Sequence, residues 1–219
     1  NLKDYTPDDP SWNGNLDKTV PSVKISAGAS TLEMLGIVRP QGFLTRTNTA
    51  GRFFALGGAY LNPSTHGASF GESRLAAQVV SVRVMNADGD ISVYAGEDVI
   101  DFRGSLGLLG VVTALEVELR RDTGLTMVRD SFPIEQKYSR SAAEAFFRQK
   151  LTGTDGTEFF YFVYEDIIES YSIELSSDKS GFDPTSTQAW YDDQIAKFPD
   201  LVYSGGSSLG VPGGRDYRG

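Results

Sequence analysis

Alternation of apolar and polar residues predicts the strands in the first half of the chain. This period of two occurs at residues 23–26, 79–85, 90–94 and 111–119. In the last of these segments Leu115 and Val117 share a face with Val111 and Leu119. The turn before residue 90 contains Gly89, which tolerates the positive φ of a tight turn, so a β-hairpin is predicted there.

Helix starts are predicted at two capping boxes. Ser30 and Glu33 have the spacing at which a hydroxyl and a carboxylate each accept an N–H at the helix start, and the helix 31–38 should end before Pro40. Ser141 and Glu144 have the same spacing and predict a second helix that ends near Lys150. Further strands are predicted at 125–134, 158–164 and 171–175.

Two segments are too rich in glycine for a helix or a strand and are predicted to be loops. The first, 55–72, holds the single histidine of the chain, and the second reads GSLGLLG at 104–110. Ordinary turn chemistry explains an isolated glycine such as Gly89 or Gly96. It explains these two segments less well, and the alternative is a close approach of the backbone to a ligand.

These elements predict an α+β fold in two parts. Residues 1–22 are interpreted as an extended arm, 23–122 as the first domain, 123–175 as the start of a second, and 176–219 as a loop-rich tail. The aromatic run at 159–164 could be a substrate wall, but a buried strand is the preferred interpretation. The acidic residues Glu165, Asp166 and Glu169 are interpreted as a solvated face.

Composition excludes several classes of function. The net charge is −9 and no run of Lys and Arg stands out, which argues against a nucleic-acid or anionic-membrane partner. No apolar window of about 18 residues predicts a membrane span. Without cysteine there is neither a disulfide nor thiol catalysis, and a single histidine argues against a zinc site. We therefore expect no metal.

Four segments in order resemble the second half of the FAD-binding domain of the vanillyl-alcohol-oxidase family, which has the PCMH-type FAD-binding fold. They read VKISAGASTLEML, LGGAYLNPSTHGASFG, LAAQVVSVRVMNADGDI and GSLGLLGVVTALEVEL, and they extend over 23–119. Sugar-lactone oxidases and alditol oxidases look most similar. The resemblance implies the second subdomain of that FAD-binding domain, followed at 125–175 by part of the family's α+β substrate (cap) domain.

The resemblance implies FAD as the cofactor. The binding residues that it implies are Gly57, Gly58, Ser64, Thr65, His66, Gly67, Gly107, Gly110, Val111 and Val112. Backbone amides at the glycines would approach the pyrophosphate and the flavin, with hydroxyl donors from Ser64 and Thr65. His66 would line the site, without the covalent flavin link; the other interpretation is a loop histidine bonded to nearby backbone. No catalytic residue is assigned.

Three expectations follow from the resemblance. The loops 57–67 and 104–110 should lie side by side, because both must reach one cofactor. Valine at Gly58 or Gly67 should weaken flavin binding more than folding. The family's upstream subdomain has no counterpart in residues 1–22, so the remaining part of the FAD domain should be supplied by the same or another chain, and residues 1–219 alone should bind FAD poorly.

Two hypotheses about function remain open at this point. In the first, the chain is an FAD-dependent oxidoreductase, or a fragment of one, that oxidises a hydroxyl-bearing carbon of a small sugar-derived lactone or polyol. The electrons would pass to the flavin and then to oxygen or another acceptor. In the second, the chain is a degenerate or split homologue that serves as a structural subunit. Resemblance of fold cannot separate the two.

Overall fold

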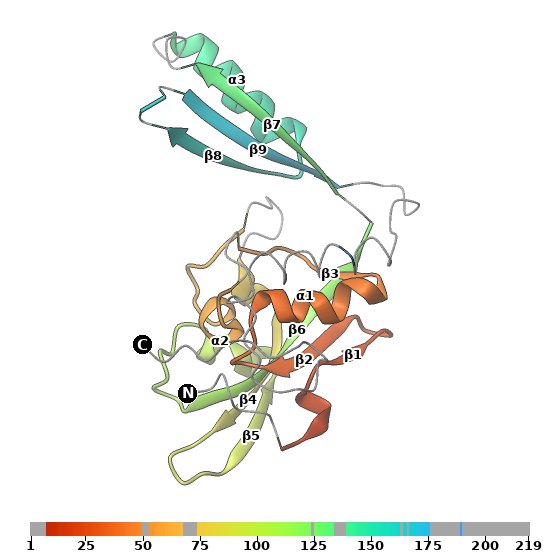
Figure 1. Cartoon of the computed structure of the whole chain (residues 1–219). Helices are drawn as coiled ribbons and strands as arrows, with labels where there is room; N and C mark the ends of the chain where they lie inside the picture. Colours follow the sequence, from red (N-terminus) through yellow and green to blue (C-terminus); the bar gives the residue numbers. More distant parts are fainter. Residues whose placement is uncertain are drawn as a thin grey trace. The chain divides into compact units, whose positions relative to one another are not determined.

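The computed structural model describes residues 8–49, 53–67, 74–123, 125–133, 139–162, 164–165, 167–175 and 189. They form two compact units, one from 8–67 and 74–122 and one from 123–175 (Figure 1). Each unit combines an antiparallel sheet with helices, which confirms the predicted α+β class. The predicted loop-rich tail lies outside the described residues apart from Ala189. None of the described helices is long and apolar enough to cross a membrane.

The first unit is built on an antiparallel sheet. The strands follow the order β1 (Asn15–Asp17), β2 (Ser22–Ser26), β6 (Val111–Arg121), β4 (Val79–Met85) and β5 (Ile91–Ala95), and β3 (Phe43–Thr45) pairs with the far end of β6. The four predicted strands and the hairpin at Gly89, which has φ 88°, are thereby confirmed. Residues 1–22 are not only an extended arm, because β1 joins the sheet and Trp12 is buried.

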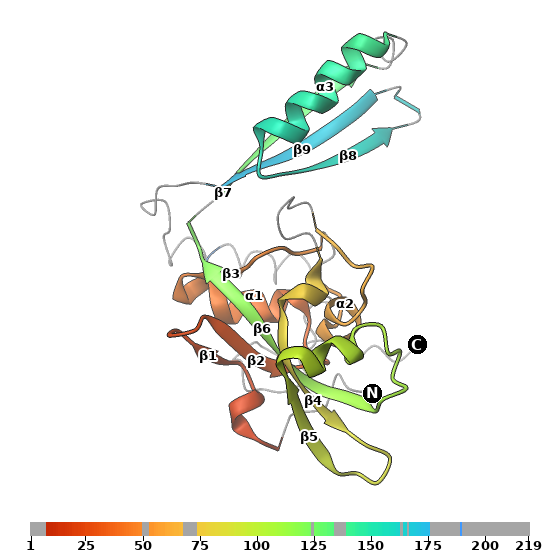
Figure 2. The same cartoon turned by 180° about the vertical axis from the view of Figure 1, so that it is seen from behind.

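Helices cover one face of this sheet. Side chains of α1 (Thr31–Val38), α2 (Leu56–Tyr60) and the 3-10 helix η4 (Leu75–Gln78) form one hydrophobic core with the apolar residues of β2, β4 and β6 (Figures 1 and 2). The capping box at α1 is confirmed: Glu33 N donates to Ser30 Oγ at 3.1 Å, and Ser30 N donates to Glu33 Oε2 at 2.6 Å. Shorter 3-10 helices are η2 (Pro10–Trp12), η3 (Arg39–Gln41) and η5 (Gly96–Phe102).

Helix α2 corrects the prediction that the first glycine-rich segment contains no helix. Its five residues read LGGAY, and the buried side chains of Leu56 and Tyr60 anchor it to the core. Gly57 N donates to the carbonyl of Ala27 at 2.8 Å. Tertiary packing therefore overrides the low helix propensity of two consecutive glycines.

The second unit is a three-stranded antiparallel sheet with one helix. The strand order is β7 (Leu125–Pro133), β9 (Ile167–Leu175), β8 (Gly156–Phe162), and α3 (Arg140–Gly153) packs on one face (Figure 2). The predicted strands are confirmed, but the capping box at Ser141 is wrong. Ser139 caps α3 by accepting from Ala142 N, and Glu144 pairs instead with Arg140 at 2.7 Å, one helical turn earlier.

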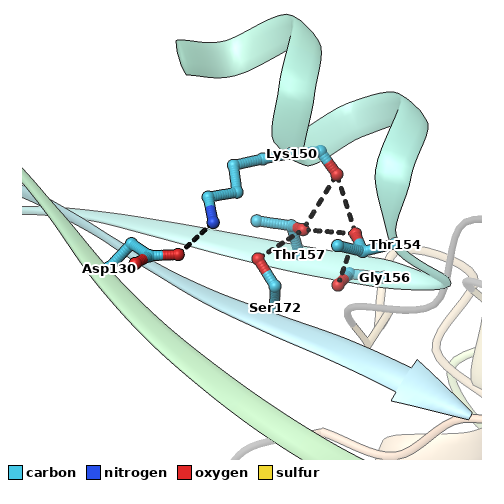
Figure 3. A network of polar contacts seen from close by, with 6 residues as sticks. All are labelled: Asp130, Lys150, Thr154, Gly156, Thr157 and Ser172. Atoms are coloured by element: carbon cyan, nitrogen blue, oxygen red, sulfur yellow. Dashed lines mark hydrogen bonds and ion pairs between the residues drawn. The ribbon is translucent and has the colours of Figure 1, made fainter.

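The interface between α3 and its sheet has an aromatic layer and a polar layer. Phe146 lies 4.9 Å from Phe132 between ring centroids, and Phe147 lies 4.8 Å from Phe159. At the end of the helix, the buried Lys150 pairs with Asp130 (Figure 3). The carbonyl of Lys150 accepts from Thr154 and Thr157, and the Thr157 and Ser172 hydroxyl oxygens lie 3.2 Å apart, within hydrogen-bond distance. This network ties the end of α3 to β8 and β9.

The aromatic run of β8 is not the buried strand that we expected. Phe159 packs under α3, but Phe160, Tyr161, Phe162 and Tyr164 are exposed. The reason is topological, because β8 is an edge strand of the sheet and a single helix shields one side.

Candidate cofactor site

The two glycine-rich loops lie side by side, as predicted. Gly104 N donates to the carbonyl of Leu61 at 2.8 Å. A Cβ at Gly104 would lie 3.1 Å from Pro63 Cγ, so the two segments are in van der Waals contact there. This contact joins residues 57–67 to residues 104–110 within the first unit and creates a single candidate site.

Two glycines of α2 differ in their surroundings. A Cβ at Gly57 would lie 3.1 Å from Ala27 Cβ, so Gly57 is explained by the packing of α2. A Cβ at Gly58 would meet nothing within 4 Å, and in the described part of the chain its N–H has no acceptor. Neither has a positive φ. The backbone conformation at Gly58 therefore does not require glycine, contrary to expectation. Gly58 does, however, provide open space and a free N–H donor.

The segment after α2 presents polar groups at the surface. Ser64 and His66 are exposed, and within the described residues neither these side chains nor the Thr65 hydroxyl has a hydrogen-bond partner. The backbone here is ordered by Thr65, whose carbonyl accepts from Leu75 N at 3.1 Å. Gly67 is different, because a Cβ there would overlap the Asn48 carbonyl and the Thr47 hydroxyl. Its lack of a side chain is a packing requirement, and φ at Gly67 is not positive.

The second loop exposes leucines on a strained backbone. Gly107 has φ 83°, with open space where a Cβ would be, and Leu106 has φ 52°, a region that costs a non-glycine residue about 1–2 kcal/mol. The side chains of Leu106 and Leu108 are 93% and 88% exposed. The N–H groups of Leu106, Gly107 and Leu109 find no acceptor among the residues that the structure describes. Free donors and apolar side chains therefore lie together in the second loop.

The predicted contacts at the start of β6 lie next to this loop. Val111 and Val112 pair with Met85 and Val84 of β4, whereas β2 pairs with β6 only as far as Ala114. At Val111 and Val112, therefore, β2 does not pair with the opposite edge of β6. Val111 is half exposed, and Gly110 is fixed by packing, since a Cβ there would lie 2.7 Å from Val84 Cγ1.

Tyr60 is a buried phenol of α2. Burial raises the pKa of the Tyr60 hydroxyl above its ordinary value, and the hydroxyl donates to Asn48 Oδ1 at 3.0 Å. Tyr60 therefore stays protonated and supports the loop. Among the described residues no group of three or more His, Cys, Asp or Glu side chains is placed to hold a metal ion.

The sheet, the helices on one face and the paired glycine loops define the class of fold. It is the α+β fold found in the FAD-binding domains of FAD-linked oxidoreductases, and the resemblance predicted from the four sequence segments is confirmed. No protein-family model matches the chain.

Some individual relatives are similar in sequence and others in structure. Over 160 residues the chain is 29% identical to L-gulono-1,4-lactone dehydrogenase from two strains of Mycobacterium tuberculosis, covering 73% of this chain and 32% of the relative. Two structures of cholesterol oxidase from Brevibacterium sterolicum, one of a point mutant, have TM-scores of 0.61 and 0.60 at 16% identity. They cover 75% and 73% of this chain and 34% and 33% of the oxidase.

By name, these relatives are a dehydrogenase and an oxidase, in agreement with the expected class of oxidoreductase. The chain spans about a third of the length of the relatives that it matches. The activity, substrate and partners of the whole protein are therefore treated below as proposals.

Sequence reasoning missed one group of polar residues in the second unit. Glu169, interpreted as solvated, is 2% exposed and bonded to Arg129 and Tyr171. The signal was present in the alternation of β9, where Glu169 shares a face with Ile167, Tyr171 and Ile173. A carboxylate among such residues indicates a partner on a neighbouring strand.

Proposed function

We propose that the chain is part of an FAD-dependent oxidoreductase that acts on a CH–OH group of a small sugar-derived lactone or polyol. The observation that carries the proposal is the contact between the two glycine-rich segments at Gly104, Leu61 and Pro63. Each segment has N–H groups without an acceptor among the described residues, and the second also has exposed leucines. The relatives support it, because one is a lactone dehydrogenase and the others are oxidases.

The residues present fit a dinucleotide. Gly58 and Gly107 leave open space where a side chain would stand, and their N–H groups are free within the described chain to bind phosphate oxygens. The hydroxyls of Ser64 and Thr65 would add donors. Leu106 and Leu108 would cover an apolar ring, and that contact would offset the strained backbone at Leu106. When bound, FAD supplies the acceptor for the hydride.

A structural subunit is the second candidate function. It is favoured by Gly57 and Gly67, whose lack of side chains is explained by packing without any cofactor. The two functions differ in a simple spectrum. Reconstitution with FAD of a form that includes the remaining part of the FAD domain should give bound flavin absorbing at about 450 nm in the first case and none in the second.

The test is a titration followed by anaerobic reduction. The chain is mixed with FAD, free flavin is removed by gel filtration, and L-gulono-1,4-lactone is added while the flavin absorbance is recorded. Bleaching of retained flavin by the lactone would support the proposal. Absence of retained flavin, both in the 219-residue chain and in a longer natural form that includes the remaining part of the FAD domain, would refute it.

A further inference from the structure

The sheet of the second unit has one face that α3 covers and one that none of the described helices covers (Figures 1 and 2). Alternation along the strands assigns Arg129, Phe160, Glu169 and Tyr171 to the second face, because Tyr171 pairs with Arg129 and Glu169 pairs with Phe160. We call these four residues the Arg129 cluster. They come from all three strands of the sheet.

Glu169 is the buried centre of the Arg129 cluster. Its side chain accepts from Arg129 Nε at 3.0 Å, from Arg129 Nη2 and from the Tyr171 hydroxyl at 2.6 Å. These bonds satisfy a carboxylate that would otherwise be costly to bury. They also use two nitrogens of the guanidinium group and therefore fix its plane.

Arg129 itself remains available to a ligand. Its side chain is 62% exposed, whereas that of Glu169 is 2% exposed. The ion pair is therefore buried at the carboxylate and open to solvent at the guanidinium group. The donors on Nη1 have no acceptor in the part of the chain that the structure describes. The guanidinium carbon lies over the Tyr171 ring, 5.8 Å from its centre, and this cation–π contact helps to hold the group in place.

The charge of the Arg129 cluster favours a neutral ligand. Hydrogen bonds from Arg129 and Tyr171 hold the pKa of Glu169 below its ordinary value, so the two charges cancel at neutral pH. The cluster therefore offers oriented N–H donors with little net positive charge. Glu158 lies beside Tyr171 on the same face, which further disfavours an anion.

The Arg129 cluster also has an apolar surface. Phe160 is 44% exposed, and its ring stands at 89° to Tyr171 with 5.4 Å between the centroids. Phe162, two residues further along β8 and on the same face, is exposed as well. Fixed hydrogen-bond donors next to an aromatic ring suit molecules that combine hydroxyl groups with apolar C–H surfaces.

We propose that the Arg129 cluster is a binding site for a neutral polyhydroxylated small molecule. Nη1 of Arg129 donates to ligand oxygens, Phe160 packs against the C–H face, and Glu169 and Tyr171 act as positioning residues for the guanidinium group. Only the claim that the bound molecule is the substrate of the enzyme rests on the proposed function. Binding itself requires no flavin.

The experiment is ligand binding by the full 219-residue chain without FAD. Saturation-transfer NMR is recorded with L-gulono-1,4-lactone and sorbitol, and with gluconate as the anionic comparison. The variants are Arg129→Lys and Phe160→Leu, and the matched control is Arg148→Lys, which makes the same chemical change at an exposed residue of α3. Far-UV circular dichroism checks that each variant is folded.

Binding of the lactone or sorbitol, weakened at least tenfold by Arg129→Lys or Phe160→Leu and unchanged by Arg148→Lys, would support the site. No saturation transfer, equal affinities in all variants, or tighter binding of gluconate would overturn it. The outcomes remain distinct from those of the proposed function. A chain that retains FAD but shows no dependence on Arg129 refutes this inference alone. Lactone binding, together with no retention of FAD by the chain or by the longer natural form, refutes only the flavoprotein proposal.

Discussion

Replacing Gly58 by alanine separates cofactor binding from folding. Gly58 lies in α2 without a positive φ, and a Cβ added there meets no atom of the protein within 4 Å. Removing a helical glycine reduces the freedom of the unfolded chain, so the free energy of unfolding should rise by about 0.5–1 kcal/mol. If FAD occupies the open space beside Gly58, the same methyl group should weaken FAD binding at least tenfold, or about 1.4 kcal/mol.

Gly67→Ala is the matched control, since it makes the same change nine residues later. There the added Cβ overlaps the Asn48 carbonyl, so the loop must shift, with a cost to stability of about 1–3 kcal/mol. The expectation that substitution of Gly67 affects flavin binding more than folding is therefore replaced by the opposite prediction.

The assay compares two quantities for each variant. Urea denaturation followed by far-UV circular dichroism gives the free energy of unfolding, and quenching of flavin fluorescence, with FAD up to millimolar concentration, gives relative affinity. A Gly58→Ala variant that is stabilised but binds FAD within twofold of the parent would refute the placement of the cofactor beside α2. A Gly58→Ala variant that is destabilised would refute the structural reasoning itself.

Four further predictions concern an exposed leucine, the remaining part of the FAD domain and the two ion pairs of the second unit. Leu108→Ser should leave the free energy of unfolding within about 0.5 kcal/mol of the parent, because the side chain is exposed, yet weaken FAD binding in the fluorescence titration. Calorimetric titration of residues 1–219 should show weak FAD binding; tight stoichiometric binding by a monomer would contradict the need for the remaining part of the FAD domain. Asp130→Asn should destabilise the second unit by about 1–3 kcal/mol, since it leaves the buried Lys150 without a charged partner, and a change below about 0.5 kcal/mol would contradict the importance of that pair. The folded-state pKa of Glu169 is lowered, chiefly by the hydrogen bonds from Arg129. The contribution of ionised Glu169 to the free energy of unfolding is therefore fully present above its unfolded pKa and is lost as pH falls through its folded pKa. Urea denaturation between pH 3 and about pH 7 should show a smaller loss of stability on acidification for Glu169→Gln than for the parent.

Much of the fold could be predicted from local patterns. The capping box at Ser30, the hairpin turn at Gly89 and the alternation of β6 each depend on residues close together in the sequence, so they can be identified without knowing the tertiary contacts. The contact between the two glycine-rich loops was also predicted, but from resemblance to a family rather than from propensity.

Other features were decided by tertiary structure. Two consecutive glycines form part of a helix because Leu56 and Tyr60 are buried on either side of them. Which serine caps α3, and which aromatic residues of β8 are exposed, depend on where the helix meets the sheet.

For the candidate sites, too, some features follow from composition and others depend on tertiary contacts. The sequence alone determined which segments are rich in glycine and which contain hydroxyl side chains, because these are properties of composition. Only the folded chain decided that Gly58 faces open space while Gly67 is enclosed, and that the carboxylate of Glu169 is buried against Arg129 rather than solvated. Burial and cross-strand pairing join residues far apart in the sequence, 40 positions in this ion pair and 94 positions between Ser22 and Glu116, and no local pattern specifies them.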